Sequence, residues 1–220
     1  MATRYSADLF VPNLPVAALV LRAHRVLELH GLILDANPEV WVDDQDVDDP
    51  IPEYVASSVE DAARYAEQWP HASAMGYSLR HAPTDPSSPF TGYVVRVFYS
   101  SHLELSVLGL GFIGNAFQAD HFPDTLPLIT SLVEALHEEF SACRSGFDWG
   151  FSDDVREADE ILALTTGRVE ARPPQWLDII DPALVTEEVL AEYEAAKGPT
   201  SLLRRTANAS LFWQRDAGPP

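Results

Sequence analysis

Cysteine, basic residues and long apolar runs are all scarce in this sequence. Cys143 is the only cysteine among 220 residues, which excludes a disulfide framework and a cysteine-based zinc site. The apolar stretch 14–29 is interrupted by two arginines, a histidine and a glutamate, so it is unlike the run of about 20 apolar residues that spans a bilayer. The first residues also lack the basic and apolar regions of a signal peptide. We therefore expect a cytoplasmic protein that does not bind membranes.

The shortage of basic residues sets the electrostatics. Only 14 Lys and Arg oppose 34 Asp and Glu, which gives a formal net charge of -20. A field of this sign repels nucleic acid and attracts basic partners. Acidity also serves solubility alone, so the charge describes association and not fold. With 46% hydrophobic and 22% charged residues, the composition is that of a chain that folds by itself.

Hydrophobic periodicity predicts both helices and strands. Apolar positions recur at steps of three and four in 14–30 and 125–143, which is typical of helices with one buried face. Alternating apolar and polar residues predict a half-buried antiparallel meander. Its strands are expected at 73–81, 91–100 and 102–112. The fold class we predict is α+β, a mainly antiparallel sheet with helices packed on one face.

The chain ends in a compact series of short elements. An acidic helix is expected at 152–164, and Pro173-Pro174 then separates a main α+β domain (1–172) from a C-terminal segment (173–220). Within that segment the pattern predicts a strand, a short helix and a closing hairpin. We expect the segment to pack on the same domain.

An acidic stretch between two expected elements is the foremost candidate for partner contact. Residues 43–53 combine crowded carboxylates with two prolines, which disfavours regular structure and predicts an exposed loop. Ser57 and Glu60 form a capping box that starts the following helix. Trp69 and Trp176 adjoin turns or prolines and are candidates for exposed anchors, since large aromatics dominate interface energetics. The predicted partner-binding residues are Asp43, Asp44, Asp46, Asp48, Asp49, Glu53, Trp69 and Trp176.

The same stretch fails as a calcium loop. Asp44, Asp46 and Asp48 occupy the first three ligand positions, but Asp49 stands at the glycine position and Val55 at that of the bidentate glutamate. An EF-hand is therefore excluded.

Two other motifs fail on their mechanism. Gly109, Gly111 and Gly114 match a dinucleotide-binding pattern, but no helix opens at the third glycine and the surrounding strands are expected to be antiparallel. A bulged strand end is the better interpretation. His137-Glu138 begins like a zinc-protease helix, yet Ser141 occupies the position of the second histidine ligand. We expect no metal site and no cofactor.

Nucleophilic catalysis has no local signature either. The sequence has no Gly-x-Ser-x-Gly elbow, and Cys143 continues the apolar stripe of its expected helix. A catalytic group assembled from distant residues remains possible because such groups are defined by geometry and not by chain order. A hydrolase of this kind would draw on His71, His81, His102, Asp120 and His121.

The C-terminal segment resembles a known group of proteins. Residues 174–185 (PQWLDIIDPALV), continuing through Leu190 to a hairpin ending Leu211-Phe212-Trp213, are similar to the closing segment of bacterial immunity families, such as the type-52-like immunity proteins of polymorphic toxin systems. Those families carry a strand, a short helix started by proline and a closing hairpin in that order. The resemblance implies a small α+β cytoplasmic protein that binds and occludes a cognate toxin.

The sequence thus favours a non-catalytic immunity-type protein that neutralises a toxin by occlusion. The expected toxin is basic, because a nuclease must hold phosphates and an acidic inhibitor complements such a surface. The alternatives are a hydrolase with a dispersed His/Asp site and an acidic adaptor that mimics nucleic acid. An enzyme would place several of its histidines in one pocket, whereas a mimic would carry its carboxylates in regularly spaced rows.

Overall fold

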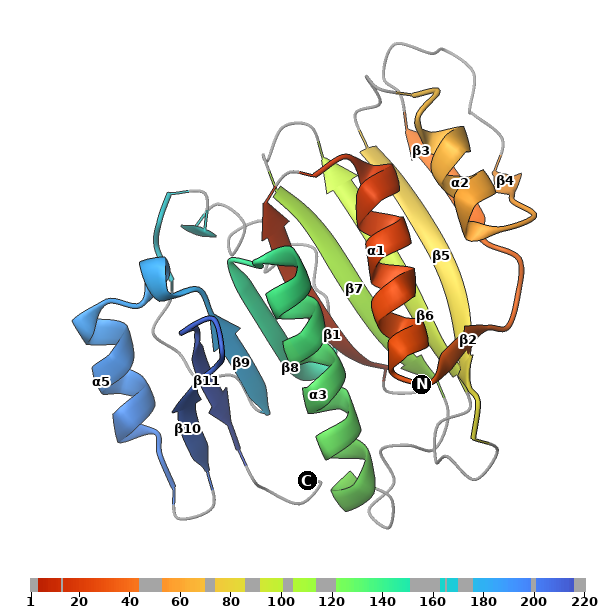
Figure 1. The fold of residues 1–220 in the computed structure, drawn as a ribbon. Helices are drawn as coiled ribbons and strands as arrows, with labels where there is room; N and C mark the ends of the chain where they lie inside the picture. The colour runs from red at the N-terminus through yellow and green to blue at the C-terminus, as the bar shows by residue number, and fades with distance from the viewer. Residues whose placement is uncertain are drawn as a thin grey trace.

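One antiparallel sheet runs through the computed structural model (Figure 1). The structure describes residues 4–12, 14–43, 53–69, 74–85, 92–100, 105–113, 122–150, 163–164, 166–169, 176–198 and 201–215. The strands occur in the order β10-β11-β9-β8-β1-β7-β6-β5-β3-β4, and β2 also pairs with β5. The strands are β1 (Arg4–Pro12), β2 (Leu32–Leu34), β3 (Glu39–Asp43), β4 (Tyr54–Val55), β5 (Ala74–Pro83), β6 (Gly92–Ser100), β7 (Leu105–Ile113), β8 (Arg144–Gly150), β9 (Leu177–Ile180), β10 (Leu202–Arg205) and β11 (Leu211–Gln214).

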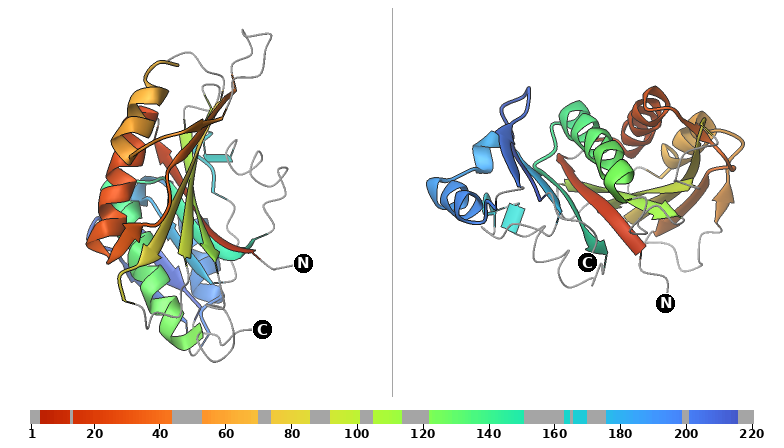
Figure 2. Two further views of the ribbon diagram at one scale, coloured as in Figure 1. Left: turned by 90° about the vertical axis from the view of Figure 1, so that its right-hand side faces the viewer. Right: turned by 90° about the horizontal axis from the view of Figure 1, so that it is seen from below.

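Helices cover the sheet on one face over most of its width. Seen edge-on, α1, α2 and α3 all lie on the same side of the strands (Figure 2). The predicted fold class, a mainly antiparallel sheet with helices on one face, is confirmed, and so is the meander of β5, β6 and β7. The helical elements are α1 (Val16–Leu29), α2 (Val59–Ala66), α3 (Phe122–Phe140), the 3₁₀ helix η1 (Pro182–Leu184) and α5 (Glu187–Ala195).

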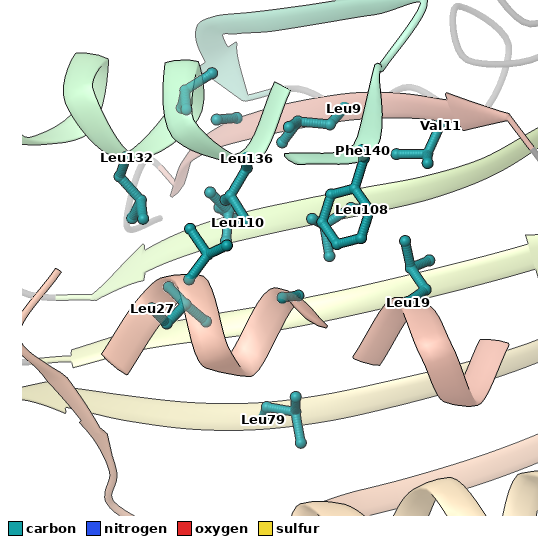
Figure 3. Packing of buried hydrophobic residues seen from close by; sticks show 14 of the residues in the cluster. Leu9, Val11, Leu19, Leu27, Leu79, Leu108, Leu110, Leu132, Leu136 and Phe140 are labelled. Atoms are coloured by element: carbon teal, nitrogen blue, oxygen red, sulfur yellow. The ribbon is translucent and has the colours of Figure 1, made fainter. Parts of the chain in front are cut away.

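The main core lies between these helices and the sheet. Its residues come from one side of each strand because successive side chains alternate across a sheet. Figure 3 shows the central part, where α1 and α3 meet β1, β5 and β7. The predicted apolar stripes of α1 and α3 form the helix side of this core, and the labelled residues on the sheet side are aliphatic. The labelled side chains are Leu9, Val11, Leu19, Leu27, Leu79, Leu108, Leu110, Leu132, Leu136 and Phe140, each at most 4% exposed.

The C-terminal strands bury side chains on both faces. Leu177 and Ile179 of β9 belong to the main core, whereas Ile180 packs in a second cluster with Val189 and Tyr193 of α5. Since neighbouring residues of a strand face opposite sides, α5 covers the face opposite to α3. Strand β9 pairs with β8, so this segment continues the same sheet.

Three expectations need correction. Strand β8 was not expected, although it pairs with both β1 and β9. Gly109 is not at a bulged strand end but in the middle of β7, in regular register with Asp8 and Arg96. Helix α3 begins at Phe122, three residues before the expected start. The expected acidic helix at 152–164 lies almost entirely outside the described residues.

The first helix also begins differently from the expectation. It starts at Val16 and not at residue 14, and its N-cap position is Pro15, which provides no side-chain cap. Gly31 follows the C-cap residue His30 and has a φ of +76°. Glycine adopts this left-handed conformation without the steric cost that a Cβ atom brings.

Candidate protein-binding surface

Acidic residues gather at one edge of the sheet. Residues 39–69 contain ten of the 34 acidic residues but only one of the 14 basic residues, Arg64. The described residues of this range form β3, β4 and α2, and the two strands lie at the end of the strand order opposite to β10. We call its described residues, 39–43 and 53–69, the acidic edge.

Strand β3 builds this edge by pairing with β5 over its full length and with β4 over two residues. Val40 and Val42 point into the core, where they are 0% and 7% exposed. The alternate residues Glu39 and Trp41 therefore lie on the face that the helices leave open. Both are exposed, Trp41 by 41%.

Helix α2 is attached to β4 through one carboxylate. Ser58 is the N-cap, and its hydroxyl accepts a hydrogen bond from the Asp61 amide at 3.1 Å. The Asp61 carboxylate in turn accepts hydrogen bonds from the Ser57 amide, the Ser57 hydroxyl and the Tyr54 hydroxyl at 2.9–3.0 Å. These bonds lower the pKa of Asp61, and its carboxylate raises the pKa of Tyr54. The cap therefore involves Ser58 and Asp61, one residue later than the predicted pair of Ser57 and Glu60.

Aromatic rings link β4 to the end of α2. Tyr54 and Tyr65 stack with their ring centroids 4.1 Å apart and their planes 11° apart. Trp69 lies against Tyr65 at a centroid distance of 6.3 Å. All three rings are half-buried against the main core. These contacts stabilise the acidic edge, because stacked aromatic pairs add to the stability that burial provides.

The open face of the edge mixes carboxylates with apolar side chains. Val55 is 59% exposed and lies directly across from Glu39 in the register. Glu53, which precedes β4, is exposed as well. Together with Trp41, these residues present apolar surface between negative charges. An exposed aromatic surrounded by polar groups is typical of protein-binding sites.

The predicted partner-binding residues differ in whether the structure describes them and in how exposed they are. Asp43 is the last residue of β3 and pairs with Ala74, whereas Asp44, Asp46, Asp48 and Asp49 lie outside the described residues. Glu53 is exposed as predicted, and Trp69 is half-buried. Trp176 is 2% exposed, so its predicted exposure is wrong. It lies in the main core, because burying its large ring on the α3 side outweighs the effect of the neighbouring prolines.

Of the residues considered for hydrolysis, the structure describes only His81. His81 is fully buried on β5, and its Nε2 lies 2.9 Å from Nδ1 of His24 on α1. Burial, followed by the neighbouring His24, lowers the pKa of His81 to about 4. The other residues considered, His71, His102, Asp120 and His121, lie outside the described residues. His81 therefore joins α1 to the sheet as a neutral group.

A buried histidine that the sequence analysis did not assign connects three elements. His137 of α3 has Nδ1 2.8 Å from the Ser145 hydroxyl on β8 and Nε2 3.1 Å from the Ser210 hydroxyl before β11. Burial lowers its pKa to about 4. His137 lies four residues after Val133 on the apolar stripe of its helix, and this spacing could have indicated its burial.

Metal binding and membrane insertion have no support in the described residues. Among them, no three His, Cys, Asp or Glu side chains are grouped so that they could hold a metal ion. No helix in the described ranges is both long enough and apolar enough to cross a membrane.

The chain is similar in fold to two solved bacterial structures. It aligns with the Pseudomonas aeruginosa T6SS protein PA0821 at a TM-score of 0.46 and 13% identity, over 96% of this chain and 69% of that one. It also aligns with a chain from the complex of the toxic C-terminal tip of CdiA from Pseudomonas aeruginosa with its immune protein, at a TM-score of 0.39 and 9% identity, over 70% of this chain and 90% of that one. No family model and no curated protein matches the sequence. Both TM-scores lie below 0.5, so neither likeness assigns an activity.

Proposed function

We propose that this protein is an immunity-type inhibitor without catalytic activity. It binds a basic toxin through the acidic edge and neutralises the toxin by covering the toxin's active site. The observation that carries the proposal is the concentration of charge at the acidic edge, whose described residues include six acidic residues (Glu39, Asp43, Glu53, Glu60, Asp61 and Glu67) and one basic residue, Arg64. Asp44, Asp46, Asp48 and Asp49 continue the same charge in sequence between β3 and β4.

Charge alone does not hold a complex together, because exposed ion pairs contribute little net free energy. Affinity comes mainly from a few well-packed apolar anchors, whereas complementary charge raises the association rate and selects the partner. The acidic edge offers both, with Trp41 and Val55 exposed beside Glu39 and Glu53. A toxin that acts on nucleic acid fits this surface best, because the site with which it holds phosphates must be basic.

The test begins with capture of the partner. The tagged protein is expressed in its own host, purified at low salt, and its stoichiometric partners are identified by mass spectrometry. We expect a basic domain that stops growth when it is expressed alone. Co-expression with this protein should restore growth, and the purified pair should lose the toxin's activity at a one-to-one ratio.

Two results would overturn the proposal. One is a partner whose expression leaves growth unaffected. The other is a toxic partner whose activity persists when the complex is saturated, since occlusion requires loss of activity at stoichiometric binding. Turnover of a small molecule by the purified protein alone would instead favour the hydrolase.

A further inference from the structure

The pattern of hydrogen bonds between β3 and β4 leaves the backbone amide and carbonyl of one β4 residue pointing away from β3. The Ala56 amide donates to the Pro38 carbonyl at 2.8 Å, and Val40 pairs with Tyr54 two residues along. In an antiparallel ladder the pair between two hydrogen-bonded pairs points its N–H and C=O groups away from each other. That pair is Glu39 and Val55. The Val55 amide and carbonyl therefore point away from β3, toward the outer side of the sheet.

The described residues place no strand on that outer side, since β4 is the last strand in the order. The open stretch ends at Ser57, whose amide already donates to the Asp61 carboxylate at 2.9 Å. Unpaired strand edges act as templates for another extended chain. Here the template is short and is centred on Val55.

We infer that β4 accepts an extended segment of the partner, which adds a strand to the sheet at Val55 and carries an apolar side chain next to Val55 with a Lys or Arg next to Glu53. This inference rests on the proposed function and defines how the partner binds. The Val55 amide would donate to a carbonyl of the segment, and the Val55 carbonyl would accept from one of its amides. Main-chain bonds of this kind give affinity, while alternate side chains give specificity.

Charge complementarity argues for this occupant. Glu39 and Glu53 are both exposed, and Val55 lies between them on the open face with 59% of its surface exposed. A cationic residue two positions from an apolar one matches this spacing, because alternate residues of a strand share a face. A second copy of this chain is disfavoured, since it carries the same net charge of -20.

The test uses a capped peptide with the repeat Lys-Thr-Val-Thr, which places lysine and valine two positions apart on one face of a strand, with binding measured by titration while the Val55 amide is followed by NMR. Val55→Pro removes the outward amide without removing a bond to β3, and Val55→Thr is the matched variant that keeps the amide. We expect the wild type and Val55→Thr to bind alike and Val55→Pro to bind about tenfold more weakly, as loss of one main-chain bond implies. The Val55 amide should also exchange more slowly with solvent when the peptide is bound.

A second peptide tests strand addition on the wild-type protein, so that the result does not depend on whether the proline variant folds. It has the same side chains, but alternate amides are N-methylated, so it keeps the charge and cannot pair as a strand. The wild type should bind it at least about tenfold more weakly. Equal binding of both peptides, equal binding by Val55→Pro, or no binding of the first peptide would overturn strand addition. A captured toxin that is neutralised despite such a result would leave the proposed function standing.

Discussion

The Arg144 guanidinium of β8 meets the Asp178 carboxylate of β9 at two points, with Nε 3.0 Å from Oδ1 and Nη2 2.8 Å from Oδ2. Both side chains are buried, and the Tyr193 hydroxyl of α5 also donates to Oδ2. The carboxylate thus joins the main sheet, the C-terminal strands and α5. An ion pair in this position favours the observed packing of the C-terminal segment on the sheet, because breaking a buried ion pair is costly.

Asp178→Asn should therefore destabilise the fold strongly. The change keeps the shape of the side chain but removes the carboxylate charge that Arg144 meets at two points, and breaking a buried ion pair typically costs about 3–5 kcal/mol. Tyr193→Phe removes one hydrogen bond to a charged group and should cost about 1.5–3 kcal/mol. Urea unfolding at neutral pH measures both free energies.

The exposed pair of Arg80 and Asp35, 3.1 Å apart, supplies the control. Asp35→Asn should change the free energy of unfolding by less than about 1 kcal/mol, since solvent screens that pair. A similar cost for the Asp35 and Asp178 variants would mean that burial does not strengthen the inner pair.

The two buried histidines should make the fold sensitive to mild acid. Burial lowers the pKa of His81 and His137 to about 4, whereas an unfolded histidine has a pKa of about 6.5. Between these values the unfolded chain binds more protons than the folded protein. The stability contributed by each neutral histidine is therefore fully present above pH 6.5 and is lost as the pH falls from about 6.5 to about 4, by up to about 3 kcal/mol each.

Free energies of unfolding from pH 7.5 to 4.5 check this expectation. His137→Gln retains hydrogen-bonding groups for Ser145 and Ser210 but does not titrate, so the difference between wild type and variant should shrink as the pH falls. This comparison also cancels the effect of carboxylate protonation on the free energy of unfolding, because both proteins lose the same negative charge as the pH falls. A difference that is constant across the range would show that His137 does not bind a proton on unfolding.

Local patterns were sufficient to predict the meander and the helices that cover it. Strand β8 was missed because only Phe147 and Trp149 alternate with polar residues, whereas Arg144, Ser145 and Gly146 before them supply no apolar position. Its stability comes from pairing on both sides and from the partner that Arg144 finds 34 residues away. Contacts of this separation leave no local signal, since they depend on strand order.

The candidate surface could likewise be predicted only in part, because it depends on contacts between segments far apart in the sequence. The charge of 43–53 is visible in the sequence. That β3 pairs with β5, and so places Trp41 and Glu39 on the open face, follows from a contact across the acidic loop and α2. The burial of Trp176 likewise depends on a core whose other members lie far from it in the sequence.

Gly31→Ala should destabilise the end of α1. Gly31 has a φ of +76°, and its carbonyl accepts hydrogen bonds from the Thr84 amide and hydroxyl at 2.8 and 3.0 Å. An added Cβ would lie 3.5 Å from the Thr84 hydroxyl, an ordinary contact, so the cost comes from the backbone conformation and should be about 1–2 kcal/mol. Gly198→Ala is the control, because an added Cβ there meets only the Ser201 hydroxyl at 4.0 Å. Thermal unfolding compares the two, and an equal loss would contradict the conformational cause.

Neutralising two carboxylates of the acidic edge should slow capture of the partner more than neutralising two elsewhere. The Glu39→Gln/Glu53→Gln variant removes charge beside Val55, whereas Glu192→Gln/Glu194→Gln makes the same change in net charge at two exposed positions of α5, which packs on the strands at the far end of the order. Steering depends on charge near the contact and is screened over about 8 Å at physiological ionic strength. Stopped-flow or surface-based kinetics with the captured toxin should therefore show an association rate several-fold lower for the first variant at low salt. The α5 variant should stay near the wild type, and all three rates should converge in high salt. If both variants slowed association equally, the total charge of the protein, and not its acidic edge, would be what draws the partner in.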